Sequence, residues 1–193
     1  IAVNVTGDAD APTLSTQNAS GTEDSAIALN ISSALTDTDG SETLSITISN
    51  VPDGASLSAG TNNGDGSWTL TPAQLSGLTI TPPNNSNENF DLTVTATSTE
   101  NDGDTATTTS QIAVSVTGDA DAPTLTTQNA SGTEDTAIAL NISSALTDTD
   151  GSETLSVTIS GVPDGANLSA GTNNGDGSWT LTPAQLSGLT ITP

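Results

Sequence analysis

Carboxylates are the only charged side chains in this 193-residue chain, which has 23 Asp and Glu residues and no Lys, Arg or His. They gather in short groups within turn-rich segments. The clearest groups are Asp37, Asp39 and Glu42 and, later in the chain, Asp148, Asp150 and Glu153. Calcium takes about six to eight oxygen ligands, often from Asp-x-Asp spacing with a Gly that turns the backbone. Since no cationic side chain relieves these groups, the pattern predicts calcium rather than zinc, which prefers His or Cys.

Further acids occupy linker-like and turn segments. The segment Gly-Asp-Ala-Asp-Ala-Pro occurs twice. A further group of acidic residues lies around Gly103. The additional candidate metal ligands are Asp8, Asp10, Glu23, Asp102, Asp104, Asp119, Asp121 and Glu134. The alternative interpretation is that these are solvated turns and a plain acidic linker, because turns favour Asp and Gly for conformational reasons.

The composition excludes several classes of function. A nucleic-acid surface needs Lys or Arg, and anionic membranes attract basic segments, so neither partner is expected. Without Cys the chain has no disulfide and no thiol nucleophile. Paired carboxylates can serve as the acid and base of a glycosidase. No His, Lys, Arg, Cys or Tyr is present to assist them. We therefore expect that the chain is not an enzyme.

Residues 112–193 repeat residues 1–82, with differences at only six aligned positions. The repeat period, from Ile1 to Ile112, is the length of a whole domain. We expect the end of a preceding repeat's last strand at 1–7, a complete repeat at 8–118, and a second copy at 119–193 that stops before its last strands. Such a second copy should not close a core unless neighbouring chain supplies the strands.

Apolar residues alternate with Ser, Thr and Asn along most of the repeat. The alternating segments are residues 27–31, 44–48, 68–70, 78–80, 90–96 and 112–116. This period of two predicts an all-β fold of Ig-like antiparallel β-sandwich domains in tandem. Residues 72–75 are the one place where a helical turn is expected. Trp68 and Trp179 are predicted to be core residues rather than a platform for stacking sugars.

Two features resemble the cadherin family. Residues 112–123 (IAVSVTGDADAP) resemble the last strand and calcium-binding linker of a cadherin-type repeat. Glu23, followed by Asp37-x-Asp39, is similar to that family's base glutamate and Asp-x-Asp motif. Together with the near-identical copies, the chain most resembles the extender region of giant bacterial RTX-type adhesins, whose repeats are cadherin-like or Ig-like.

The resemblance implies calcium at the junction between copies. Its ligands would be Glu23 from the first copy, Asp119 and Asp121 from the linker, and Asp148 and Asp150 from the second copy. One junction earlier, the corresponding ligands would be Asp8, Asp10, Asp37 and Asp39, with Asp102 or Asp104. Where the family has an Asp after the penultimate strand, this chain has Ser98, and its acids follow at Glu100, Asp102 and Asp104.

The implied function is that of a structural extender on a bacterial surface, stiffened by calcium at its junctions. Its direct partners would be neighbouring repeats of the same chain, with ligand-binding domains elsewhere in the protein and no membrane insertion. We expect an extracellular location. The alternative function is a calcium-dependent adhesion module that binds carbohydrate or a second copy of itself.

Overall fold

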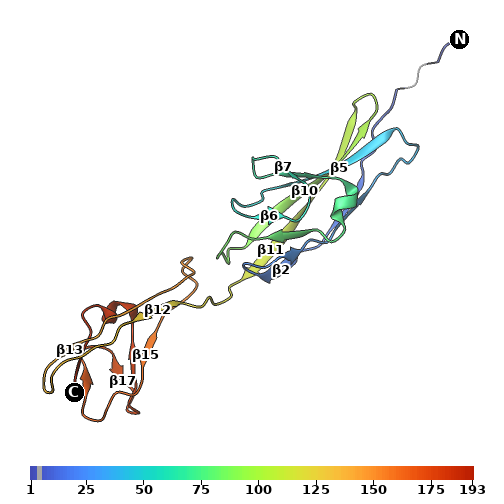
Figure 1. The fold of residues 1–193 in the computed structure, drawn as a ribbon. Coiled ribbons are helices and arrows are strands. Elements are labelled where there is room, and N and C mark those ends of the chain that lie inside the picture. Colours follow the sequence, from blue (N-terminus) through green and yellow to red (C-terminus); the bar gives the residue numbers. More distant parts are fainter. Residues whose placement is uncertain (4–5) are drawn as a thin grey trace. The chain divides into compact units, whose positions relative to one another are not determined.

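The computed structural model describes residues 1–3 and 6–193 and divides into two compact units. Unit 1 is Ile1–Asp119 and unit 2 is Ala120–Pro193. Both are built from β-strands in mainly antiparallel sheets (Figure 1). Helical structure in the described residues is limited to two short 3-10 turns. None of it is long and apolar enough to span a membrane.

The described residues of unit 1 contain eleven strands, most of them short. They are β1 (Thr13–Thr16), β2 (Ala19–Thr22), β3 (Ile27–Ala28), β4 (Ile31–Ala34), β5 (Glu42–Ser49), β6 (Ser56–Leu57), β7 (Thr61–Asn62), β8 (Trp68–Leu70), β9 (Thr79–Thr81), β10 (Phe90–Glu100) and β11 (Thr105–Thr117). The 3-10 turn η1 (Pro72–Leu75) follows β8. It begins after Thr71, whose side chain and backbone pair with those of Gln74 in a capping box.

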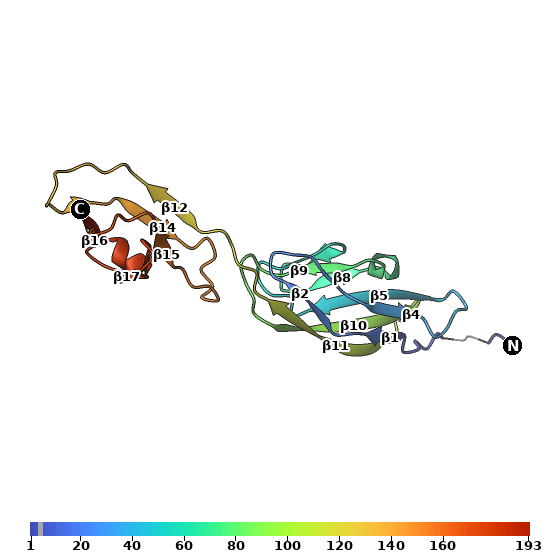
Figure 2. The same cartoon turned by 90° about the horizontal axis from the view of Figure 1, so that it is seen from below.

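The sheets of unit 1 are organised around the long hairpin formed by β10 and β11 (Figure 2). The largest sheet has the order β2-β11-β10-β5-β8-β7, in which only the β2–β11 pair is parallel. A three-stranded sheet, β3-β9-β6, and the pair β1-β4 complete the unit. The strand β10 lies between β11 and β5 and pairs with both, so it sets the register of each.

The core of unit 1 lies between these sheets. Every second residue of β10 and of the last half of β11 points inward, as the period of a strand requires. Leu92, Val94 and Ile112 are fully buried there and form one cluster with Ile46 of the neighbouring strand β5 and Ile80 of β9 in another sheet. Trp68 packs partly buried against this core, in agreement with its prediction as a core residue.

Unit 2 has eight strands, all shorter than five residues. They are β12 (Thr124–Thr127), β13 (Ile138–Ala139), β14 (Ile142–Ala145), β15 (Val157–Ile159), β16 (Asn167–Leu168), β17 (Thr172–Asn173), β18 (Trp179–Leu181) and β19 (Thr190–Thr192). The turn η2 (Pro183–Leu186) repeats η1. The strands form three sheets of order β12-β14, β13-β19-β16 and β15-β18-β17. A smaller core surrounds Leu181, Leu189 and Trp179.

Apart from residues 27–31, each alternating segment lies in or overlaps a single strand, and residues 72–75 form the expected turn. The segment 27–31 differs from its prediction, because the chain changes sheets within it: β3 pairs with β9 and β4 pairs with β1. Leu29 N donates to Leu78 O at 2.9 Å between the two. Of the strand expected at 1–7, residues 1–3 and 6–7 have no strand structure, and residues 4–5 lie outside the described residues.

Candidate metal centre

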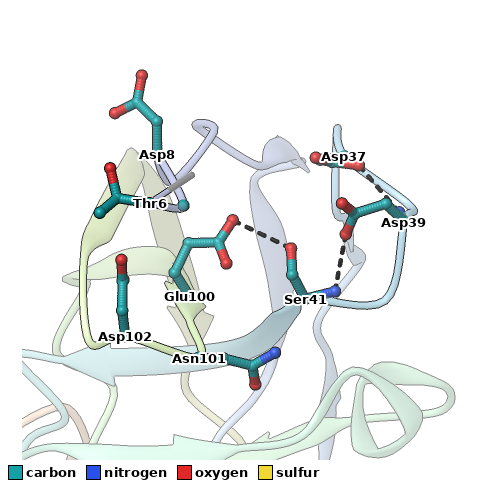
Figure 3. Close-up of a pocket in the computed structure, with 9 residues that line it drawn as sticks. Thr6, Asp8, Asp37, Asp39, Ser41, Glu100, Asn101 and Asp102 are labelled. Atoms are coloured by element: carbon teal, nitrogen blue, oxygen red, sulfur yellow. Dashed lines mark hydrogen bonds between the residues drawn. The ribbon is translucent and has the colours of Figure 1, made fainter. Parts of the chain in front are cut away.

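Three segments of unit 1 meet at one end of the β10–β11 hairpin. They are the hairpin turn after Glu100, the loop between β4 and β5, and the segment that leads into β1. An open pocket between them is lined by Thr6, Gly7, Asp8, Asp37, Asp39, Ser41, Glu100, Asn101 and Asp102 (Figure 3). The ends of β5 and β10 coincide there because the two strands pair in register through Glu42 and Glu100.

Glu42 and Glu100 are both buried, each with 7% of its surface exposed. Directly paired residues on antiparallel strands have side chains on the same face, with Cβ atoms roughly 4.5–5.5 Å apart. Two like charges in that position repel one another, and the repulsion grows as water is excluded. No Lys, Arg or His exists anywhere in the sequence to compensate them. The pair therefore favours a bound cation.

Few hydrogen bonds reach these two carboxylates. The backbone N–H of Asp10 donates to Glu42 Oε1 at 2.7 Å, and the Ser41 hydroxyl donates to Glu100 Oε1 at 3.1 Å. Glu42 Oε2 is buried and has no hydrogen-bond partner among the described residues. A buried polar atom without a partner is costly, and a carboxylate oxygen in this state is a suitable ligand for a hard cation.

Gly7 lies against the Glu100 carboxylate. A Cβ at this position would come within 2.7 Å of Glu100 Cδ and Oε2. Any side chain at residue 7 would therefore displace the carboxylate or the segment that carries Asp8. The close approach explains why glycine is needed here, in the Gly-Asp-Ala-Asp segment.

The loop before β5 is shaped by its own acids. Asp39 N donates to Asp37 Oδ1 at 2.9 Å, and Ser41 N donates to Asp39 Oδ1 at 2.8 Å, so two successive turns are each closed by an Asp side chain. Hydrogen bonding by Ser41 lowers the pKa of Asp39. Figure 3 shows Glu100 between this loop and Asp102 of the hairpin turn.

The hairpin turn holds the segment that leads into β1. Asp104 Oδ2 accepts a hydrogen bond of 3.0 Å from Ala9 N, and Asp104 N donates to Asp102 Oδ1 at 3.2 Å. Asp104 therefore binds the backbone of Ala9, the residue between Asp8 and Asp10. The predicted residues Asp8, Asp10, Asp37, Asp39, Glu42, Asp102 and Asp104 are consequently all found at this end of unit 1.

The opposite end of unit 1 carries a third buried glutamate. Glu23 is 2% exposed, and its Oε1 accepts a hydrogen bond of 2.7 Å from Asp119 N. Its backbone N–H donates to Thr117 O at 3.0 Å, which continues the β2–β11 pairing. Here too a buried carboxylate binds the backbone of the Gly-Asp-Ala-Asp segment.

Unit 2 repeats part of the arrangement. Asp121 N donates to Glu153 Oε1 at 2.6 Å, and Glu153 Oε2 is buried without a hydrogen-bond partner in the described chain. Asp148 Oδ1 accepts from Asp150 N at 2.8 Å, as Asp37 does from Asp39. Glu134, the counterpart of Glu23, is exposed.

Glu100 was missing from the predicted ligand set. The alternation of β10 contains the signal that would have found it, because Leu92, Val94 and Ala96 point inward and the same face continues through Ser98 to Glu100. Ser98 is fully buried, and its hydroxyl has no hydrogen-bond partner among the described residues. The inward face of β10 therefore changes from apolar to acidic toward its end.

The donor set consists entirely of oxygen atoms, mostly carboxylates on loops. This chemistry fits calcium and does not fit zinc. The buried, unpartnered Oε2 of Glu42 is the observation on which the fit depends. The chain matches no protein-family model and no curated protein.

Proposed function

We propose that this chain belongs to a structural extender of a secreted or cell-surface bacterial adhesin, built from Ig-like, cadherin-like units in tandem and stiffened by calcium at the junctions. The observation that carries the proposal is the facing buried pair Glu42 and Glu100 in a chain without cationic side chains. Near-identical copies support it, because repetition of one unit increases length without adding a different activity.

Calcium would act through linkage to folding. An ion that binds only the ordered state stabilises it by about 2.7 kcal/mol when its concentration is 100 times the dissociation constant. Glu23 in unit 1 binds Asp119 N, and Glu153 in unit 2 binds Asp121 N. An ion bound to these glutamates would hold their carboxylates in place and, through the two hydrogen bonds, the linker backbone as well. The linker would then lose its freedom to bend.

Thermal unfolding of the full chain, in millimolar calcium and in chelator, tests the ion. Calcium is expected to raise the unfolding temperature of unit 1 by several degrees or more. In chelator, Glu100→Gln should stabilise unit 1 because it removes one of two facing charges. In calcium, the Glu100→Gln variant should gain less stability from the ion than the unchanged chain does.

Asp91→Asn is the matched control for this variant. Asp91 lies exposed on the same strand, so its replacement removes one charge without changing the buried pair. It should leave the response to calcium unchanged. Equal unfolding temperatures with and without calcium would contradict the metal site.

Small-angle scattering of the full chain tests stiffness separately from binding. We expect greater flexibility, and a changed maximum dimension, when calcium is chelated. If calcium binds but the scattering profile remains the same, the site exists and the stiffening role is wrong. The alternative adhesion module would instead show calcium-dependent self-association by sedimentation.

A further inference from the structure

We propose that Asn63 and Asn174 are latent deamidation sites, whose side chains react only when the hairpins that carry them open. Each is followed by a glycine, Gly64 or Gly175, and these are the two Asn-Gly pairs of the sequence. Asparagine is a thermally labile residue, and glycine, which has no Cβ, leaves its own backbone nitrogen unhindered. The proposal holds whether or not calcium binds and does not rest on the extender function.

The reaction needs water as its one co-reactant. The backbone nitrogen of Gly64 loses its proton to a base from solvent and attacks Asn63 Cγ, the Cγ–Nδ2 bond breaks, and ammonia leaves. Water then opens the resulting five-membered succinimide at one of its two carbonyl carbons. The product is aspartate or isoaspartate, and in both cases one new carboxylate replaces a neutral amide.

Both hairpins hold the attacking nitrogen in a hydrogen bond. In the β7–β8 hairpin, Gly64 N donates to Asn62 Oδ1 at 2.8 Å. In the β17–β18 hairpin, Gly175 N donates to Asn173 Oδ1 at 2.9 Å. The proton that the reaction removes is therefore already shared with an acceptor, and this bond must break before the nitrogen attacks.

Two hydroxyl groups hold the Asn63 carboxamide across the β7–β8 hairpin. Asn63 Nδ2 donates to Ser67 Oγ at 2.9 Å and to Thr69 Oγ1 at 3.1 Å. The Ser67 hydroxyl is itself fixed, because it donates to Asp65 Oδ1 at 2.6 Å. Rotation of the Asn63 side chain toward the next backbone nitrogen therefore breaks two hydrogen bonds.

The β17–β18 hairpin repeats these contacts. Asn174 Nδ2 donates to Ser178 Oγ at 2.9 Å and to Thr180 Oγ1 at 3.1 Å, and the Ser178 hydroxyl donates to Asp176 Oδ1 at 2.6 Å. Asn63 and Asn174 are both exposed to water. Hydrogen bonding rather than burial therefore protects them, and the protection lasts as long as each hairpin stays closed.

The first test ages the full chain at mildly alkaline pH, with and without denaturant, and locates the products by mass spectrometry. A protease that cleaves before aspartate releases peptides 53–64 and 164–175, which differ in mass through Ser56 and Asn167. A new cleavage before residue 63 or 174 marks aspartate, whereas isoaspartate is not cleaved. Both sites should react at least about tenfold more slowly in the folded chain than in denaturant. Equal rates would overturn the proposal.

The second test removes the two hydroxyl acceptors in one copy, through Ser67→Ala with Thr69→Val. Asn174, in its unchanged hairpin, is the internal control. The ratio of the Asn63 rate to the Asn174 rate in the folded chain should rise by roughly twofold to tenfold for each hydrogen bond lost. A hairpin that opens in this variant should raise the ratio further. An unchanged ratio would show that these bonds do not protect Asn63, and the proposal would be wrong.

The third test checks the route in denaturant, where folding plays no part. Gly64→Ala places a Cβ beside the attacking nitrogen, so it should slow the reaction of Asn63 several-fold and leave Asn174 unchanged. If Asn63 loses ammonia at the same rate in Gly64→Ala, the reaction does not use this nitrogen and the proposal fails.

Discussion

Residues 42–49 and 153–160 have the same sequence except for Ile46 and Val157, yet their structures differ. The first segment is an eight-residue strand, and the second contains a strand of only three residues. The three residues are those that pair with the neighbouring strand on one side in both units. The other residues of β5 are strand because β10 pairs with them. The length of the strand is therefore set by the neighbouring strands that pair with it.

The same comparison applies to β2. Residues 19–22 form a strand that pairs in parallel with β11, whereas residues 130–133, with the identical sequence, are not in a strand. Among their Ala, Ser, Gly and Thr residues only Thr favours strands, and Ala and Gly disfavour them. Such a segment depends on backbone hydrogen bonds from a neighbour to become a strand.

Local features are the same in both units. Asn63 Nδ2 donates to Ser67 Oγ at 2.9 Å, and Asn174 donates to Ser178 at 2.9 Å. The capping boxes before η1 and η2 also agree. These contacts join residues only a few positions apart, so they form without the hairpin.

The largest effect is expected from Val94→Asp in β10. Val94 is fully buried, and an unpaired charge there costs about 3–5 kcal/mol. Residues 42–45 should then exchange their amides as rapidly as residues 153–156, measured by hydrogen exchange on the full chain. Thr95→Asp, on the opposite face of the same strand, is the control. Persistent protection of residues 42–45 in Val94→Asp would show that β5 does not depend on β10.

A smaller effect is expected from the matched pair Ile48→Ala and Ile159→Ala. Ile48 is fully buried, so its truncation should lower the stability of unit 1 by about 2–5 kcal/mol. Ile159 is only partly buried, and its loss should cost unit 2 roughly half as much or less. Denaturant unfolding, with exchange assigned to each unit, measures both. Equal costs would mean that the hairpin adds no packing at this position.

The smallest effect concerns the turn acids Asp65 and Asp176. The hydroxyl and then the N–H of Ser67 lower the pKa of Asp65 from its ordinary value of 3.8, and Ser178 does the same for Asp176. A lowered pKa in the folded state stabilises the fold above the unfolded pKa, and the contribution is lost as pH falls through the folded value. Ser67→Ala should raise the pKa of Asp65 alone, and Ser178→Ala that of Asp176 alone, by equal amounts in an NMR titration.

The period of two in the sequence predicted the strands that carry large apolar residues. It missed β1 and β2 and the first half of β11, because Thr- and Ser-rich segments show no contrast between their two faces. It also missed Glu100, which belongs to the site through its strand position rather than through a turn motif. Burial of an acid depends on what packs over it, and the sequence pattern contains little of that information.

The sequence by itself determined the all-β class, the turns and the Asp-closed loop before β5, because these depend on residue type and on neighbours within a few positions. Only the tertiary structure decided where strands end and which acids are buried. Glu42 and Glu100 are 58 positions apart and meet because β5 and β10 pair in one register. Glu23 and Glu134 occupy equivalent positions in the two copies, yet Glu23 is buried and Glu134 is exposed, because burial depends on the packing around a residue rather than on its local sequence.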